Sequence, residues 1–444
     1  MYKRKFTVVT QLHENNNKHL IDYIDSSRSE YAKAVRETFH SIKHSKDFSK
    51  SSFNTYLQHT YGITKRTANS IISDAQGRLN ALKELKIYEK TQLERKIKYL
   101  KECVIPKLEQ KRDSNSTMLR LGSTVSLISQ RNLRCKIVAK KQKLNRLNQK
   151  LSNLEYQIES SKYKLCFGTK YLLQRDYKSF VERRDSQMSF VGSKTEAACN
   201  SQFQLKYDAR NNQFDLRLRR DFGGFKDAKG LERYVFGKVY FRHHKNKIVQ
   251  ILKDKRSPLS FKIAKRGSRY YLYCTFEVQI DSGDFLTRST QGTIGLDFNK
   301  GFITLSETNE FGHLIQTQFL PYRFKLGDKT TTDLQQVISK VVTLAKNKGK
   351  DVCIEYLNFS NTKVRTETGK GNKYNNMLHS LAYSQFVELV ESISFRNRVF
   401  VKKVNPAWTS WVAKQKYCPQ MKLNTHVGAS FVIARRGQGY EDTV

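Results

Sequence analysis

The chain has 444 residues, enough for two or three domains that each bury a core. Its 81 Lys and Arg residues outnumber its 40 Asp and Glu residues, and the formal net charge is +41. Because this charge is spread over most of the chain rather than confined to a tail, it favours a polyanionic partner, and nucleic acid is the first candidate. The 23 Tyr and 26 Phe residues add stacking surfaces for bases. The alternative is a ribosomal or merely basic surface.

The chain has no apolar run of about 18 residues, and its amino terminus lacks the apolar core of a signal peptide. We therefore expect no membrane partner and a cytoplasmic protein, in a prokaryotic cell or its nucleoid. The seven cysteines lie far apart and none forms a CxxC pair, which argues against a disulfide framework and against a zinc ribbon. We expect no zinc.

The N-terminal third of the chain is predicted to be helical after one short strand over residues 3–12. The helical pattern covers residues 18–161. Within it, apolar side chains recur every three or four positions over residues 93–108 and again over residues 144–158. This spacing predicts two long amphipathic helices.

The polar stretch 113–129 is the predicted turn between these helices, and Pro106 can kink or end the first one early. The pair forms either a coiled-coil spacer or a lobe that grips the backbone of a duplex. The lobe is favoured because the exposed positions are rich in cations, among them Lys140, Lys141 and Lys143.

Between residues 162 and 280 the apolar pattern changes to period two, which is typical of strands. The segments 203–207 and 214–218 flank Asn211 and Asn212, a hairpin signal. Further strands are predicted over residues 234–241, 248–251, 261–263 and 271–278, with a turn at 266–268.

A run of antiparallel strands with little helix predicts a small β-barrel. His243 and His244 could be metal ligands, but no third ligand is near them in the sequence. Contacts to a nucleic-acid backbone are expected from the outward cations Arg217, Arg219, Arg220 and Arg242.

A polar stretch, residues 281–289, marks the start of an α/β domain. The first strand alternates strictly: Ile294, Leu296 and Phe298 lie on one face, and Asp297 points to the other. A tight turn at residues 299–301 leads to a second strand. A carboxylate placed just before such a turn is accessible to a metal ion or a substrate near the edge of the sheet.

The rest of this domain continues the α/β pattern, with Glu355 near the end of a buried strand. A basic loop, residues 361–373, supplies the predicted nucleic-acid contacts Lys363, Arg365, Lys370 and Lys373. The predicted elements are strand 314–319, helix 333–346 capped by Thr332 or Asp333, strand 351–357, helix 374–395, strand 398–404 and helix 425–436, which ends at Gly437.

Asp297 and Glu355 lie on separate strands of one domain, as the acids of a two-metal phosphodiester nuclease do. Carboxylate oxygens bind Mg²⁺, and paired ions activate water and stabilise the leaving oxygen. Buried acids also occur as hydrogen-bonded structural groups, so both interpretations stay open on spacing alone.

Five segments, taken in order, resemble the RuvC-like nuclease domain of the TnpB family, the transposon-encoded group held to be ancestral to type V CRISPR effectors. The matches cover residues 291–439, and the rest of the chain agrees only in layout. The segments are GLDFNKGFITLSETNEFGHL, DVCIEYLNFS, KYNNMLHSLAYSQF, VKKVNPAWTS and HVGASFVIARRG.

The resemblance implies a structured guide RNA and a duplex DNA target opened beside a short adjacent motif. It places Asp297 and Glu355 as the first and second catalytic acids, ligands of Mg²⁺ or Mn²⁺. His426 stands where family members commonly have a third acid, Asp; histidine suits manganese better than magnesium and can act as a general base. A branch of the family with histidine at this position is what the chain resembles. The zinc ribbon of many relatives is absent.

The resemblance also places Asn405, Thr409 and Ser410 near the active site, although an Asn-Pro pair is also a turn starter. Arg435 and Arg436 either grip DNA or complement the dipole of the last helix. For Trp408 and Trp411, packing is the favoured interpretation over base stacking.

The predicted fold is multidomain α+β: a wedge β-barrel begun by residues 1–17, a helical recognition lobe over 18–161, the rest of the barrel and a linker over 162–290, and a C-terminal α/β RuvC-like (RNase H-like) nuclease domain over 291–444. The predicted function is RNA-guided DNA binding with metal-dependent cleavage, by a monomer or a dimer. The alternatives are a guided binder that no longer cuts, acting as a roadblock or repressor because of His426, and a non-guided nucleic-acid chaperone.

Overall fold

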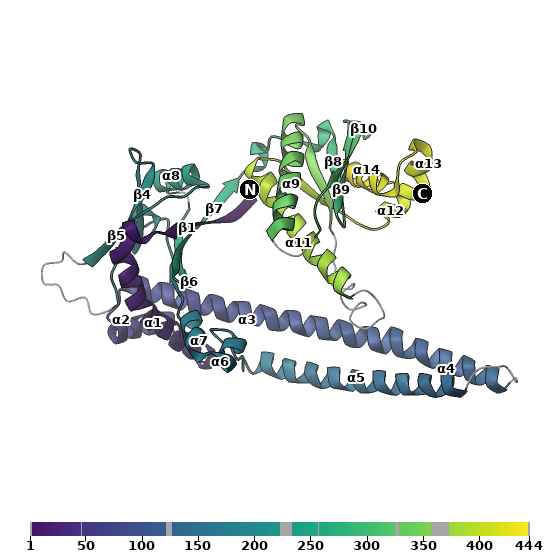
Figure 1. Ribbon diagram of the computed structural model, residues 1–444, viewed down its shortest axis with the longest axis horizontal. Helices are drawn as coiled ribbons and strands as arrows, with labels where there is room; N and C mark the ends of the chain where they lie inside the picture. The colour runs from purple at the N-terminus through teal and green to yellow at the C-terminus, as the bar shows by residue number, and fades with distance from the viewer. Residues whose placement is uncertain are drawn as a thin grey trace. The chain divides into compact units, whose positions relative to one another are not determined.

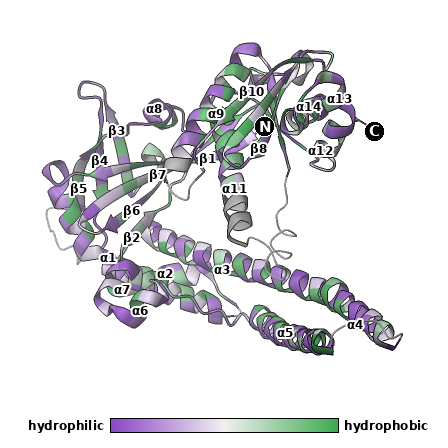
Figure 2. Ribbon diagram, turned by 45° about the vertical axis from the view of Figure 1, so that its right-hand side comes forward, coloured by the Kyte–Doolittle hydropathy of each residue, from purple (hydrophilic) through white to green (hydrophobic). Residues whose placement is uncertain are grey.

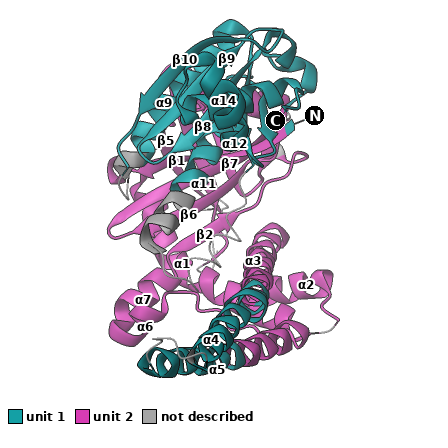
Figure 3. Ribbon diagram, turned by 90° about the vertical axis from the view of Figure 1, so that its right-hand side faces the viewer, with its two compact units in different colours: residues 1–2, 94–145, 280–444 teal, residues 3–93, 146–279 magenta. Residues whose placement is uncertain are grey.

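The computed structural model describes residues 2–45, 47–120, 127–222, 233–255, 257–324, 328–356 and 373–442 (Figure 1). The predicted basic loop therefore lies outside the described residues. Two compact units emerge (Figure 3). The magenta unit comprises residues 3–93 and 146–279 and is called the barrel-side unit, because the sequence predicts the β-barrel in this part of the chain. The teal unit, the C-terminal unit, comprises residues 1–2, 94–145 and 280–444. In the parts of the chain that the structure describes, no helix combines the length and the apolar character needed to cross a membrane.

The N-terminal third consists of one strand and long helices, as predicted. Apolar residues recur among polar ones along α3 and α5 (Figure 2), as in helices with one apolar face. The elements are β1 (Tyr2–Leu12), α1 (Glu14–His44), α2 (Lys50–Tyr61), α3 (Lys65–Tyr99), a π-helical turn (Leu100–Val104), α4 (Ile105–Arg120) and α5 (Leu127–Glu159).

The predicted turn at residues 113–129 is wrong at both ends, because α4 extends to Arg120 and α5 begins at Leu127. The polar side chains fit into the helix by bonding back to it: the Ser116 hydroxyl donates to the carbonyl of Arg112 at 2.9 Å. Pro106 does not end the helix. Pro106 has no amide hydrogen and cannot donate a helical hydrogen bond. The π-helical turn just before it, Leu100–Val104, accommodates this change, and the helix continues as α4.

The strands of the barrel-side unit form two open sheets, so the predicted β-barrel is wrong: none of the sheets among the described residues closes on itself. One sheet has the order β1-β7-β6-β2 and the other β3-β4-β5. The elements are α6 (Lys170–Arg175), α7 (Tyr177–Arg184), β2 (Gln187–Phe190), β3 (Phe203–Asp208), β4 (Gln213–Arg219), β5 (Tyr234–Val239), α8 (Lys245–Asp254), β6 (Ser260–Arg266) and β7 (Arg269–Ile280).

One reason for the open sheets is that the strand predicted over residues 248–251 is a helix, α8, which separates β5 from β6. Ile248 and Ile251 are both buried, and their spacing of three places them on one helical face. The hairpin predicted around Asn211 and Asn212 is confirmed: β3 and β4 pair antiparallel, and Asn212 has a φ of 52°, which the turn requires.

The C-terminal unit contains a five-stranded sheet in the order β10-β9-β8-β11-β12. β8 pairs antiparallel with β9 and parallel with β11, which in turn pairs parallel with β12. The predicted strands and helices occur in the predicted order, with unpredicted short helical segments over residues 409–421 between the last strand and the last helix. The elements are β8 (Thr293–Asn299), β9 (Phe302–Thr308), β10 (Leu314–Pro321), α9 (Asp328–Lys348), β11 (Asp351–Glu355), α11 (Lys373–Arg396), β12 (Val401–Val404), α12 (Thr409–Val412), a second π-helical turn (Ala413–Tyr417), α13 (Cys418–Met421) and α14 (Thr425–Gln438).

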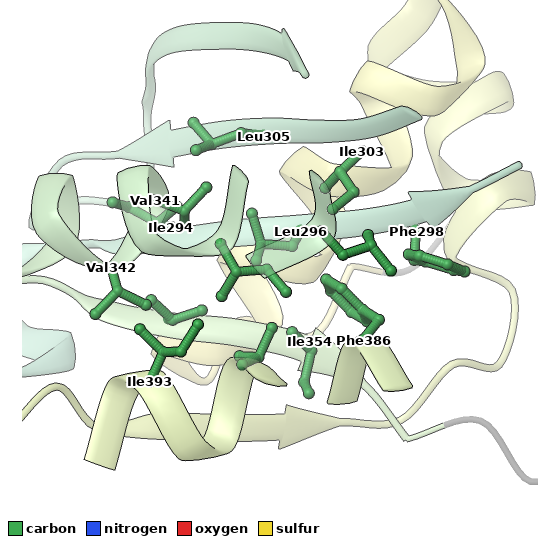
Figure 4. Packing of buried hydrophobic residues seen from close by; sticks show 14 of the residues in the cluster. Ile294, Leu296, Phe298, Ile303, Leu305, Val341, Val342, Ile354, Phe386 and Ile393 are labelled. Carbon is green, nitrogen blue, oxygen red and sulfur yellow. The ribbon is translucent and has the colours of Figure 1, made fainter. Parts of the chain in front are cut away.

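Helices cover both faces of this sheet, with α9 and α11 on one side and α14 on the other (Figure 1). The core on the α9 side is formed by alternate residues of the strands, including Ile294, Leu296 and Ile354, packed against Val341 and Phe386 (Figure 4). Each strand residue between these points to the α14 side, which is where the acids lie.

Two helix boundaries differ from the prediction. Neither Thr332 nor Asp333 caps α9, because the helix begins at Asp328 and the Asp333 carboxylate accepts a hydrogen bond from Nε of Arg323 at 2.7 Å. The last helix does not end at Gly437; it runs to Gln438 and is capped by Gly439, whose φ of 100° suits glycine.

Candidate functional site

Asp297 and Glu355 lie on neighbouring parallel strands and on the same face of the sheet. The register pairs Leu296 of β8 with Ile354 of β11, so the next residues along the two strands are Asp297 and Glu355. Both side chains point to the α14 face, away from the apolar core. Both also lie near the carboxyl ends of their strands, the edge at which α/β sheets commonly bind ligands.

Helix α14 lies very close to this face because the residues between them are small or hydroxylated. A Cβ on Gly295 would come within 2.1 Å of the carbonyl oxygen of Ser430, so only glycine fits there. The Thr293 hydroxyl donates to the carbonyl of Ala434 at 2.7 Å, and the hydroxyls of Ser306 and Ser430 are 2.6 Å apart. These contacts fix where the first turn of α14, with His426, meets the acids.

The Asp297 side chain is largely enclosed and is 14% exposed. Its Oδ2 accepts a hydrogen bond from Nδ2 of Asn299 at 2.7 Å and lies 3.5 Å from Nδ1 of His426. The second distance is longer than an ordinary hydrogen bond. The His426 side chain is 52% exposed, so histidine borders the acid and also faces solvent.

His426 is positioned by its backbone and its ring. Its carbonyl accepts a hydrogen bond from the Thr304 hydroxyl at 2.9 Å, and its ring meets the ring of Phe302 edge to face at 5.2 Å. The helix around it starts with Asn424, whose side chain caps the amide of Val427 at 2.9 Å.

Glu355 is held at both its side chain and its backbone. The Thr409 hydroxyl donates to Oε1 at 2.6 Å, and the Tyr383 hydroxyl donates to the Glu355 carbonyl. Burial raises the pKa of Glu355 to about 7, and the nearby charge of Asp297 adds to this; the Thr409 hydrogen bond and the charge of Arg436 lower it only in part. The protein thus leaves negative charge at this point incompletely compensated.

Such a carboxylate pair suits a divalent cation, which would compensate both charges at once. Mg²⁺ is commonly held by one or two carboxylates together with water and phosphate oxygens, and Asp297 and Glu355 offer oxygen donors of that kind. In the described part of the chain, no group of three or more His, Cys, Asp or Glu side chains is arranged to hold a metal ion.

The two arginines of α14 have different surroundings. Arg435 is mostly buried: its Nε lies 3.2 Å from both carboxylate oxygens of Asp442, and its guanidinium stacks 4.4 Å from the Tyr440 ring. This geometry favours a structural role. Arg436 donates from Nη1 to the carbonyls of Asn405 and Ala407 at 2.6 and 2.8 Å, and its charge reaches Glu355.

The other predicted nucleic-acid contacts lie away from these acids in the chain, and their role stays a prediction. Arg217 stacks 4.5 Å from the Tyr234 ring, Arg219 pairs with Asp221 at 3.1 Å, and Arg220 lies 6.0 Å from the Tyr23 ring. Arg242 is exposed. On α5, Lys141 pairs with Glu109 at 2.7 Å, while Lys140 and Lys143 are partly exposed. Lys363, Arg365 and Lys370 lie outside the described residues, and Lys373 is the first residue of α11.

The segment NPAWTS provides a residue that the predicted catalytic set lacked. Thr409, expected near the site by resemblance, is a direct partner of Glu355. Asn405 forms a local turn by accepting from the amide of Ala407 at 3.0 Å. Trp408 and Trp411 are 72% and 46% exposed, and their rings pack against each other with centroids 6.0 Å apart. Asn299, also missed, lies two residues after Asp297, and the period of a strand puts it on the same face.

No protein-family model matches the sequence, and no curated protein is matched by it. The solved structures that are similar to the chain include two complexes with RNA and DNA. A Cas12f1–sgRNA–target DNA complex matches at 10% identity over 98% of this chain and 100% of that chain, with a TM-score of 0.21. A Cas12i–crRNA–dsDNA complex matches at 10% identity over 89% of this chain and 57% of that chain, with a TM-score of 0.18. At such low TM-scores the function has to be argued from the site itself.

Proposed function

We propose that this protein binds DNA under the direction of a guide RNA and hydrolyses DNA phosphodiester bonds at a metal site formed by Asp297 and Glu355. The observation that carries the proposal is the pairing of these acids on adjacent parallel strands, with His426 at 3.5 Å from Asp297. The net charge of +41 supports polyanionic partners. The guide RNA and the DNA target with its short adjacent motif come from the resemblance to the TnpB family, as does the transposon or CRISPR context.

Each residue of the site has a proposed role. Asp297 and Glu355 would hold Mg²⁺ or Mn²⁺, which supplies activation of a water molecule and neutralisation of the leaving oxygen. Asn299 orients Asp297, and Thr409 holds one oxygen of Glu355 so that the other is free for a ligand. His426, half exposed at the start of a helix, is placed to contact the scissile phosphate or to move a proton. Arg436 holds the NPAW segment against this site.

The guide is tested by sequencing the RNA that copurifies with the full chain. The proposal expects one dominant noncoding species. A mixture of cellular RNA would rule out a guided mechanism, whether or not the protein cuts.

Cleavage is tested by incubating that complex with matched duplex DNA in Mg²⁺ or Mn²⁺, beside the variant Asp297→Asn, which keeps the size of the side chain and its partner Asn299. Cleavage by the wild type and none by the variant supports the proposed site. Intact DNA under both metals, with DNA binding preserved, would refute the proposed nuclease activity.

The second candidate is a guided DNA binder that blocks or represses without cutting, and His426 is the observation that favours it. His426 occupies the place of an expected acid, and nitrogen is a poor ligand for Mg²⁺. The variant His426→Asp separates the two candidates. A gain of Mg²⁺-dependent cleavage from an inactive wild type supports the binder, whereas a wild type that cuts and loses activity as His426→Ala supports the nuclease.

A further inference from the structure

Both tryptophans of the chain lie on the surface directly beside the proposed site. The sequence contains only two; Trp408 is 72% exposed and Trp411 46% exposed. Their rings meet edge to face with centroids 6.0 Å apart. Tryptophan is usually well buried in folded proteins, so an exposed pair is unusual and marks a candidate interaction surface.

The backbone holds these rings in place. Trp408 has a φ of 63°, a left-handed conformation that is uncommon for bulky non-glycine residues; such strained conformations cluster at active sites and ligand clamps. Its carbonyl accepts from the amide of Val412 at 2.8 Å. The next residue, Thr409, is buried and bonded to Glu355. The carbonyls of Asn405 and Ala407, which precede Trp408 in the chain, accept hydrogen bonds from Arg436.

The positive charge of the segment that carries the two tryptophans favours a polyanionic ligand. Residues 392–440 contain nine Lys and Arg and no Asp or Glu. Of these cations, Lys414 and Lys422 are exposed, whereas Lys403, Lys416 and Arg435 pair with Glu391 and Asp442, acids that border this segment. Cations interleaved with exposed aromatic rings are the combination with which proteins bind unpaired nucleic acid, because the phosphates meet the charges and the bases stack on the rings.

We infer that Trp408 and Trp411 form a platform on which unpaired bases of single-stranded DNA stack as the strand enters the Asp297 and Glu355 site. In a duplex the faces of the bases are covered by their neighbours, so only an opened strand can use this platform. The inference rests on the proposed function for its choice of DNA, and it adds the residues that position the strand.

Tryptophan fluorescence tests the platform without background, since the chain has no tryptophan elsewhere. Unlabelled single-stranded DNA is titrated into the full chain in EDTA, and the titration is repeated with an abasic strand of equal length, a perfectly paired duplex, an RNA of the same sequence and heparin. We expect single-stranded DNA to quench the emission, and the abasic strand, the duplex and heparin to quench it far less. Equal quenching by the abasic strand or by heparin would refute stacking, and stronger quenching by RNA would refute the choice of DNA.

Variants assign the effect to the two rings. Trp408→Ala and Trp411→Ala should each weaken the binding of a dye-labelled single strand by roughly five- to 100-fold, the range expected for loss of one stacked base. Trp411→Phe should restore most of the affinity. Phe311→Ala, which removes a ring that is 63% exposed elsewhere in the C-terminal unit, should change nothing. Unchanged affinity in both tryptophan variants would refute the platform.

The test separates this inference from the proposed function because it requires neither metal nor cleavage. Asp297→Asn should abolish cleavage and leave the quenching by single-stranded DNA intact. Quenching by single-stranded DNA without any DNA cleavage would support the tryptophan platform and refute the nuclease. DNA cleavage without quenching would support the nuclease and refute the platform.

Discussion

Replacing Glu355 with glutamine should make the protein more stable at pH 8 than the wild type, and this gain should vanish near pH 4. Glutamine keeps the size of the side chain and can still accept the hydrogen bond from Thr409, but it cannot become charged. Burial and Asp297 raise the pKa of Glu355 from 4.5 to about 7, so folding favours its protonated form. That contribution to stability is complete below pH 4.5 and is lost as the pH rises through about 7.

A rise of the pKa from 4.5 to about 7 corresponds to about 3 kcal/mol between the charged and neutral forms. Because Glu355 keeps some contact with solvent, screening lowers the expected difference to about 1–2 kcal/mol. For a domain of this size such a difference moves the unfolding midpoint by about 3–6 °C.

The assay is thermal unfolding followed by circular dichroism in EDTA, at intervals from pH 4 to pH 8.5. The difference between Glu355→Gln and wild type should grow with pH and level off above pH 7. Glu310→Gln, which removes one exposed carboxylate, is the matched control. Added Mg²⁺ at pH 8 should then stabilise the wild type more than Glu355→Gln, because the metal binds the ionised acid. A difference that does not change with pH would contradict the buried, poorly compensated charge.

Three further predictions concern packing and charge. Gly295→Ala should cost at least about 1–3 kcal/mol of stability and impair cleavage, because its Cβ would meet backbone atoms of Ser430 at 2.1 Å; Gly283→Ala, with nothing within 4 Å, should melt like the wild type. Glu307→Gln should cost about 3–5 kcal/mol, since it leaves the buried ammonium of Lys350, now 2.6 Å from Glu307, without its countercharge; a melting curve unchanged by this substitution would refute a structural ion pair. Binding of nucleic acid should weaken steeply with salt, with a linear fall of log affinity against log salt concentration, and a flat dependence would argue against extensive phosphate contacts.

The faces of the strands were predictable because the side-chain period of a strand is local. The alternation around Ile294 and Leu296 predicted that Asp297 points away from the core, and the structure confirms it. The same local signal failed at Ile248 and Ile251. A short apolar run fits either a strand or a helix, and the buried environment around these residues selected the helix α8.

Other features depended on contacts between distant parts of the chain. The open sheets replaced the predicted barrel because closure depends on how strands pair, which no single strand encodes. Arg435 looked like its neighbour Arg436 in sequence, yet it faces Asp442, whereas Arg436 holds the turn beside Glu355. Both tryptophans could have been core residues by type. Their exposure follows from the left-handed turn at Trp408 and the anchoring of Thr409.

The sequence by itself determined the charge, the α/β order of the C-terminal part and the identity of the two acids, because composition, period and residue type are properties of the chain read locally. Only the tertiary structure brought Asp297 beside Glu355, through the parallel pairing of β8 with β11. It also set His426 3.5 Å from Asp297, through the close approach of α14 at Gly295. These distances join residues far apart in the chain, and long-range packing of backbone and small side chains decides them.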